Sequence, residues 1–198
     1  YTYVLSAVNN QEVNCDGTMT ISGDGVLNAE NRSTDSMARS LGGSIILNGS
    51  TVNATGTVKT NSLEIHNDGV LNANASATSY DGAAVNVGGS ITVDGNGSLN
   101  AVGCAIENQD IMNTAILLNG NQDSKISVTG NGSITVPDSN GARYGICYDV
   151  DRRRINAEIS GKVTAYGTMC GISGINLIMS GTGSVYATGD ILGIDNTD

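Results

Sequence analysis

The sequence predicts an all-β protein: a right-handed parallel β-helix of about seven or eight coils, with three short strands in each coil. Three observations support this prediction. One short pattern recurs along the 198 residues. Apolar and polar residues alternate in runs typical of half-buried strands. The 27 Gly and 23 Asn, which both tolerate positive φ, fall at regular turn positions. Nowhere do apolar residues show the 3.6-residue period of a helix over ten or more residues.

The repeat is clearest at residues 90–103, SITVDGNGSLNAVG, where the arms ITV and SLNAV flank the turn DGNG. The second arm recurs every 19 to 35 residues, with its leading apolar residue at Leu27, Val52, Leu71, Leu99, Ile134, Val163 and Val185. The first arm contributes a matching apolar set, Ile21, Ile65, Val93, Val128, Ile159 and Met179. A third arm is predicted at residues 82–87, 104–108, 144–148, 170–175 and 192–195.

Stacked arms explain this pattern. Parallel coils lie about 4.8 Å apart, and parallel crossovers are almost always right-handed. Strand alternation turns Leu99 and Ala101 inward and Asn100 outward. The repeat continues across polar insertions at residues 30–42 and 75–81 and across the longer segments 107–122, 137–143 and 148–154, and we therefore expect residues 1–198 to form a single domain. Within 107–122 the run TAILLNG reads partly as a strand. A β-helix that stopped at residues 192–195 would expose a sheet edge. We therefore expect a neighbouring domain or partner to cover the C-terminal coil, and the chain to be a segment of a longer surface protein.

Charge excludes some partners. The net charge is −10, with 9 Lys and Arg against 19 Asp and Glu. Phosphate binding needs a basic face, so this balance argues against nucleic acid and anionic membrane surfaces. No apolar run has the length needed for membrane insertion. The chain begins at Tyr1 without a signal peptide, and we expect a mature segment whose export signal has been removed.

Three stretches carry a family resemblance: ITVDGNGSLNAVG at 91–103, ISVTGNGSITV at 126–136 and LIMSGTGSVYATG at 177–189, linked by YGI and CGI. In these motifs the chain resembles bacterial secreted and cell-surface repeat proteins of the right-handed β-helix type. Such proteins are described as adhesin-like or carbohydrate-binding. The resemblance implies an extracellular, secreted or cell-surface location, but it supplies no ligand residues to transfer.

The first candidate site is the outward stripe of the second arm. It comprises Asn28, Asn53, Asn72, Asn100, Thr135, Thr164 and Tyr186. Amides and hydroxyls repeated at each coil could hydrogen-bond the hydroxyls of a polysaccharide or host-surface glycan. The alternative is a solvated face whose amide ladders support the stacking of coils.

The second candidate site is residues 144–154, YGICYDVDRRR. It gathers Tyr144, Tyr148, Asp149, Asp151, Arg152, Arg153 and Arg154. Guanidinium groups pair with carboxylates, and tyrosine rings can stack on sugars. This composition suggests contact with an acidic glycan or a protein. Alternatively, the arginines pair with the neighbouring aspartates in a solvated loop. Tyr166 and Tyr186 could extend an aromatic patch onto later coils.

Metal and cofactor signals are weak. The turns at residues 22–25, 67–69 and 94–97 offer calcium-type oxygen ligands. However, they lack the dense Asp repetition of calcium-binding coils, and Gly-x-Gly is explained more simply as a corner with positive φ. We therefore expect no cofactor, with calcium at these turns as the alternative.

The sequence has four cysteines, at Cys15, Cys104, Cys147 and Cys170. They form no C-x-x-C pair, and we expect them to be buried as small apolar residues. A disulfide would require two of them to meet on neighbouring coils, and Cys147 with Cys170 is the best-placed pair.

No catalytic motif stands out. His66 lies beside Glu64 without a matching nucleophile. Asp149 and Asp151 would lie about 6.6 Å apart on an extended arm, a spacing that a glycosidase could use but that any D-x-D provides. The sequence thus favours a non-catalytic adhesin or glycan-binding module. The alternatives are a polysaccharide lyase or glycoside hydrolase on the same scaffold, and a purely structural spacer.

Overall fold

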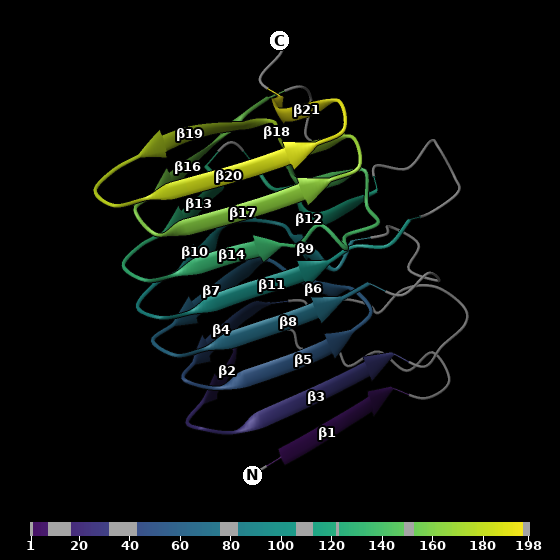
Figure 1. The fold of residues 1–198 in the computed structure, drawn as a ribbon. Helices are drawn as coiled ribbons and strands as arrows, with labels where there is room; N and C mark the ends of the chain where they lie inside the picture. The colour runs from purple at the N-terminus through teal and green to yellow at the C-terminus, as the bar shows by residue number, and fades with distance from the viewer. Residues whose placement is uncertain are drawn as a thin grey trace.

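The computed structural model describes residues 2–7, 17–31, 43–75, 83–105, 113–121, 123–148 and 153–195. Within these ranges the chain forms 21 β-strands and no helix. The strands make three sheets, here called A, B and C, in which every strand pair is parallel. Figure 1 shows the sheets as the sides of one stack that rises from the N-terminus to the C-terminus.

Sheet A contains, in spatial order, β1 (Thr2–Ala7), β3 (Val26–Asn31), β5 (Thr51–Thr55), β8 (Val70–Asn74), β11 (Ser98–Val102), β14 (Ser133–Val136), β17 (Lys162–Gly167) and β20 (Ser184–Gly189). Sheet B contains β2 (Met19–Ser22), β4 (Ser44–Asn48), β7 (Ser62–His66), β10 (Ile91–Val93), β13 (Lys125–Val128), β16 (Ile155–Ile159) and β19 (Ile175–Met179). Sheet C contains β6 (Val58–Thr60), β9 (Val85–Val87), β12 (Thr114–Leu118), β15 (Tyr144–Tyr148), β18 (Cys170–Ser173) and β21 (Leu192–Asp195).

From β4 onward the chain visits sheets B, A and C in turn, six times in succession. Each round is one coil, and consecutive coils pair strand by strand in all three sheets. This arrangement confirms the predicted parallel β-helix with three short strands per coil (Figure 1).

The register stacks like residues on like. In sheet A, Leu71, Leu99, Ile134 and Val163 lie opposite one another on successive strands, and all four are buried. In sheet B, the predicted inner ladder is confirmed and gains Leu47 between Ile21 and Ile65. Each fully buried Val, Leu or Ile contributes about 1.5–3 kcal/mol of transfer free energy, and this apolar column is therefore the main source of stability.

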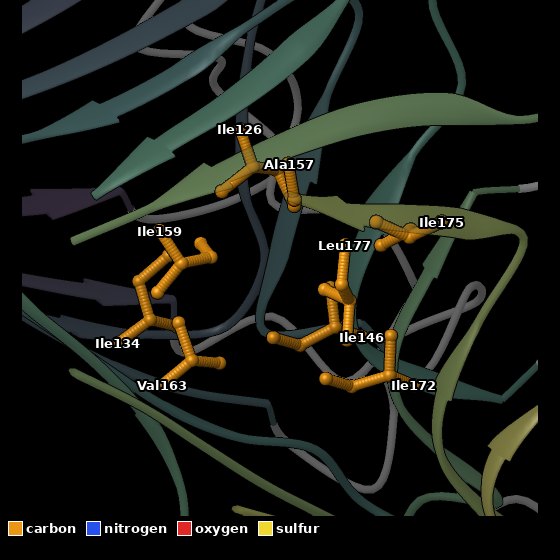
Figure 2. Close-up of a pocket in the computed structure, with 9 residues that line it drawn as sticks. All are labelled: Ile126, Ile134, Ile146, Ala157, Ile159, Val163, Ile172, Ile175 and Leu177. Carbon is orange, nitrogen blue, oxygen red and sulfur yellow. The ribbon is translucent and has the colours of Figure 1, made fainter. Parts of the chain in front are cut away.

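Side chains fill the interior of the tube. An apolar cavity of about 10 Å³ lies between the ladders of sheets A, B and C. Figure 2 shows the side chains that line it, among them Ile134, Ile159 and Ile172. This volume is at the lower limit for one water molecule, and the lining provides none of the polar partners that a water needs. The cavity is therefore a packing gap in the core rather than a ligand site.

The corner between sheet B and sheet A, here the B–A corner, has two different requirements for glycine. Its first position has positive φ in Gly23, Gly49, Asn67, Gly95, Gly130 and Gly181. Its second position requires close approach: a Cβ on Gly97 would lie 2.7 Å from the Ile65 carbonyl oxygen, and one on Gly132 would lie 2.6 Å from that of Val93. The Gly-x-Gly motif thus combines a conformational constraint with a steric constraint from the preceding coil.

Two third-arm assignments differ from the sequence prediction. In the predicted arm at residues 104–108, the described residues Cys104 and Ala105 lie outside any strand. The strand of this coil is instead β12, in the run TAILLNG that was expected to be partly strand but was not assigned to the third arm, and its Ile116 pairs with Val85 and Ile146 on the neighbouring coils. An earlier sheet C strand, β6, was not predicted. Short runs of alternating apolar and polar residues occur both in the strands of sheet C and in segments that connect strands. Only pairing with the neighbouring coils distinguishes the two.

The described cysteines, Cys104, Cys147 and Cys170, are thiols. Cys147 and Cys170 occupy neighbouring coils, but Cys147 lies opposite Ser173 and Cys170 lies opposite Tyr144. This three-residue offset separates them by about 10 Å along the strands, beyond the roughly 7 Å limit between Cα atoms of a disulfide. The suggested bond between this pair is therefore wrong, whereas both residues are buried as expected. Cys15 lies outside the described residues.

Candidate functional site

The outer face of sheet A carries a continuous asparagine ladder, formed by Asn28, Asn53, Asn72 and Asn100. Strand register places the four residues directly above one another. Each side-chain Nδ2 donates to the Oδ1 of the preceding coil: Asn53 to Asn28 at 2.8 Å, Asn72 to Asn53 at 2.9 Å, and Asn100 to Asn72 at 2.8 Å. The amide dipoles therefore point in one direction along the stack and polarise one another.

These bonds use only part of each amide. An asparagine has two N–H donors and two acceptor lone pairs, and the bonds on either side of Asn53 and Asn72 take one donor and one lone pair from each. The ladder bonds leave one donor and one lone pair of each of these amides unused, and the amides of successive coils are about 4.8 Å apart. The ladder is thus a stacking device that still presents a regular polar row.

The same column continues toward the C-terminus. Thr135 lies opposite Asn100, Thr164 opposite Thr135, and Tyr186 opposite Thr164. From β5 to β14 the outward positions of sheet A carry Thr, Val, Asn and Ser and no charged side chain. Farther along, Lys162 begins β17. The structure therefore places all seven residues of the predicted stripe in one column on the outer, mostly uncharged face of sheet A.

The second predicted site, residues 144–154, lies elsewhere. Tyr144 and Tyr148 belong to β15 in sheet C, whereas Arg153 and Arg154 precede β16 in sheet B. Asp149, Asp151 and Arg152 lie outside the described residues. The described residues of this segment therefore lie in or next to sheets C and B, away from the asparagine ladder of sheet A.

The two tyrosines of β15 are enclosed to different extents. Tyr148 is only 4% exposed, and its hydroxyl donates to the Gly120 carbonyl oxygen at 3.1 Å. Its ring is therefore part of the packing and offers no face to a ligand. Tyr144 is partly buried, and burial, followed by the neighbouring Cys147 thiol, raises the pKa of its hydroxyl. Arg153 is exposed and Arg154 is partly buried.

A cluster at the B–A corner surrounds His66, and the sequence predicted its neighbour Glu64 but not its contact with Asp94. Its Nδ1 lies 2.9 Å from Asp94 Oδ2, and its Nε2 lies 3.2 Å from Glu64 Oε2. Only the protonated imidazolium donates from both nitrogens, so two ionised carboxylates favour the charged form. Burial lowers the pKa of His66, but the hydrogen bonds and charges of Asp94 and Glu64 outweigh it and hold the pKa above 6.5.

The signal for this cluster was present in the repeat. Ile65 pairs with Val93, and therefore His66 and Asp94 hold the same corner position on adjacent coils. Next to them, Asn67 Nδ2 donates to Asn48 Oδ1, Asn96 Nδ2 to Asp68 Oδ1 at 2.8 Å, and Asn131 Nδ2 to Asn96 Oδ1 at 3.0 Å. Aligning corner positions as well as apolar arms would have revealed this second polar row.

The turns considered for calcium use their side chains in these contacts. Asp94 binds His66, and Asp68 accepts from Asn96. Among the described residues, no three His, Cys, Asp or Glu side chains are grouped in a way that could hold a metal ion.

In the same part of the chain, no helix is long and apolar enough to span a membrane. No protein-family model, curated protein or solved structure matches this chain.

Proposed function

We propose that this protein is a non-catalytic, extracellular β-helix of the bacterial secreted or cell-surface type, and that it binds polysaccharide along the outer face of sheet A. The observation that carries the proposal is the asparagine ladder, with its three inter-coil hydrogen bonds of 2.8–2.9 Å. Binding would use the amide donors and acceptors that remain on the outer side of this row.

The ladder favours binding because it orders the amides in advance. Immobilising a rotamer-rich side chain at an interface costs about 0.5–1.5 kcal/mol. Here the inter-coil bonds already fix the Asn53 and Asn72 side chains, and much of this cost is met on folding. A polymer with hydroxyl groups, each both donor and acceptor, matches a row that offers both functions at every coil.

The expected mode of binding is multivalent. A single hydrogen bond contributes about 0.5–1.5 kcal/mol net, too little for useful affinity. Several such contacts along one polymer act together because each bound sugar raises the effective concentration of the next. Affinity should therefore increase with oligosaccharide length over the four rungs of the ladder.

Affinity electrophoresis against a panel of soluble polysaccharides tests this proposal. The double variant Asn53→Ala/Asn72→Ala should lose at least about tenfold in affinity while remaining folded by circular dichroism. Thr92→Ala/Ser127→Ala, on the outer face of sheet B, is the matched control and should bind like the parent protein. Equal loss in both double variants would contradict a site on sheet A.

The same panel distinguishes the other functions. If none of the polysaccharides retards the protein, the structural-spacer interpretation is favoured. Release of reducing ends or unsaturated sugars from any polymer would favour a glycoside hydrolase or a lyase. Retention without product is the outcome expected from the proposed function.

A further inference from the structure

Two tyrosines lie at the C-terminal end of the face that carries the asparagine ladder. Tyr166 belongs to β17 and Tyr186 to the adjacent strand β20. Tyr186 pairs with Thr164, and Tyr166 pairs with Thr188. Both side chains alternate outward, and this register makes them diagonal neighbours, about 7–8 Å apart.

Their exposure suits a stacking surface. Tyr186 is 67% exposed and is the one aromatic side chain among the exposed large hydrophobic residues in the described part of the chain, and Tyr166 is partly exposed beside it. The phenol ring is amphipathic, with an apolar face and a polar hydroxyl. A pyranose ring is also amphipathic: its C–H groups form an apolar face, and its hydroxyls project from the rim. The tyrosine pair therefore provides apolar contact that the asparagine ladder lacks.

Charge limits which polymers can use this face. From β5 to β14 its outward positions carry no charged side chain, and Lys162 is the cation at the start of β17. The whole chain carries a net charge of −10. A polyanion would therefore be repelled over long range without gaining paired cations along the row.

From these observations we infer that the ligand is a neutral polysaccharide, anchored by a sugar ring stacked on Tyr186 with Tyr166 beside it, and that the following sugars run along the column of Thr164, Thr135 and the asparagine ladder. This inference rests on the proposed function, since it specifies the ligand class of the same face. It also gives the two ends of the face different roles, because stacking supplies the anchor and the amides supply the track.

The experiment uses three soluble probes: a β-glucan, a galactomannan and polygalacturonate. The parent protein should bind at least one neutral polymer, and polygalacturonate should fail to bind at low and at high salt. Tyr186→Ala should weaken neutral-polymer binding by about tenfold. Tyr186→Phe retains the ring and should stay within about twofold of the parent. Because Tyr186 is exposed, both variants should keep the parent's circular dichroism spectrum.

Each outcome has a separate meaning. Binding of polygalacturonate alone would overturn the neutral-ligand inference and leave the proposed polysaccharide-binding function intact. Neutral-polymer binding that is unchanged in both Tyr186→Ala and Tyr166→Ala would overturn the tyrosine anchor. Failure of all three polymers to bind would refute the inference together with the function on which it rests.

Discussion

At the scale of single residues, the B–A corner shows how a backbone conformation selects a side chain. Asn67 has φ of +56° and is the only non-glycine residue with positive φ in the described part of the chain. After glycine, asparagine is one of the residues that adopt this left-handed conformation most readily. Its amide also donates to Asn48 of the preceding coil, so the position contributes to stacking as well as to the turn.

Substitutions at Asn67 separate these two contributions. Asn67→Ala should lower the free energy of unfolding by about 2 kcal/mol, because it adds left-handed strain of about 1–2 kcal/mol and removes one hydrogen bond. Asn67→Gly should cost less, since it relieves the strain and loses only the amide. Urea denaturation of both variants measures the difference. Equal destabilisation would show that the corner conformation is not limiting.

The His66 cluster predicts a pH dependence with a definite sign. The pKa of His66 is raised above 6.5, against burial, by Asp94 and Glu64. A group with a raised folded-state pKa contributes stability that is fully present below its unfolded pKa and is lost as pH rises through the folded value. Asn48 occupies the paired position on β4 and is uncharged, and Asp68 follows in the same turn. The groups facing His66 therefore all favour its protonated form or are neutral.

The difference in melting temperature between the parent and His66→Gln should accordingly be largest near pH 5.5–6 and should shrink above the folded pKa of His66. The chain has one histidine, and a single NMR titration therefore reports this pKa directly. Asp94→Asn is the control that should move the pKa back toward 6.5. A parent pKa at or below 6.5 would contradict the cluster's assigned role.

At the scale of elements, the corner glycines link each strand pair to the coil beneath. A Cβ on Gly97 would meet the carbonyl oxygens of Ile65 and Asp94 at 2.7 and 2.9 Å. Both are backbone atoms that accept hydrogen bonds at this corner, the Ile65 oxygen from the Asp94 N–H at 3.0 Å and the Asp94 oxygen from the Gly97 N–H at 2.9 Å, and neither can move without disturbing these bonds. A Cβ on Gly17 would meet nothing within 4 Å. The effect of a methyl group should therefore depend on its place in the repeat rather than on glycine content.

Gly97→Ala should destabilise the protein by about 1–3 kcal/mol through overpacking, whereas Gly17→Ala should change stability by less than about 0.5 kcal/mol. Chemical denaturation monitored by circular dichroism compares the two directly. If both variants unfolded at the same denaturant concentration, close approach between coils would not explain the second glycine of the motif.

At the scale of the whole molecule, the period of the repeat was enough to predict the fold. Inward residues such as Leu99 and Ala101 follow from strand alternation, and stacking follows from their recurrence. Relationships between coils were harder to predict, because they depend on register across insertions of different length. Cys147 and Cys170 looked adjacent in sequence spacing but are offset by three residues. Residues 114–118 looked like a strand, but their place in sheet C follows only from the pairing of Ile116 with Val85 and Ile146.

The features of the candidate site were likewise predictable from the sequence only in part. The outward row of Asn28, Asn53, Asn72 and Asn100 was predictable from one arm of the repeat, and its hydrogen bonds agree with the alternative that amide ladders support stacking. The enclosure of Tyr148 was not predictable, since β15 is buried along most of its length, unlike the half-exposed strands of sheet A. The contact between His66 and Asp94 required the corners themselves to be aligned.

Stacking also determines how stability is distributed along the molecule. In a solenoid each coil is stabilised by its neighbours, so a coil with one neighbour is weaker than a coil with two. Met179, at an inner-ladder position of β19, is 47% exposed, whereas its partner Ile159 on the coil below is 1% exposed. Ile194 of β21 is 43% exposed, and its partner Ile172 is 1% exposed. The coil β19–β21 therefore presents core residues and three strand edges on its outer side.

Hydrogen exchange followed by mass spectrometry should reveal this gradient. Amides of β10, β11 and β13 should exchange slowest, because coils on both sides must open with them, and amides of β19–β21 should exchange much faster. A neighbouring domain or partner that covers this coil, as the sequence led us to expect, would slow exchange in β19–β21 while leaving the middle coils unchanged. Slow exchange of β19–β21 in the chain alone, at rates equal to those of β10, would instead show that the outer coil needs no cover.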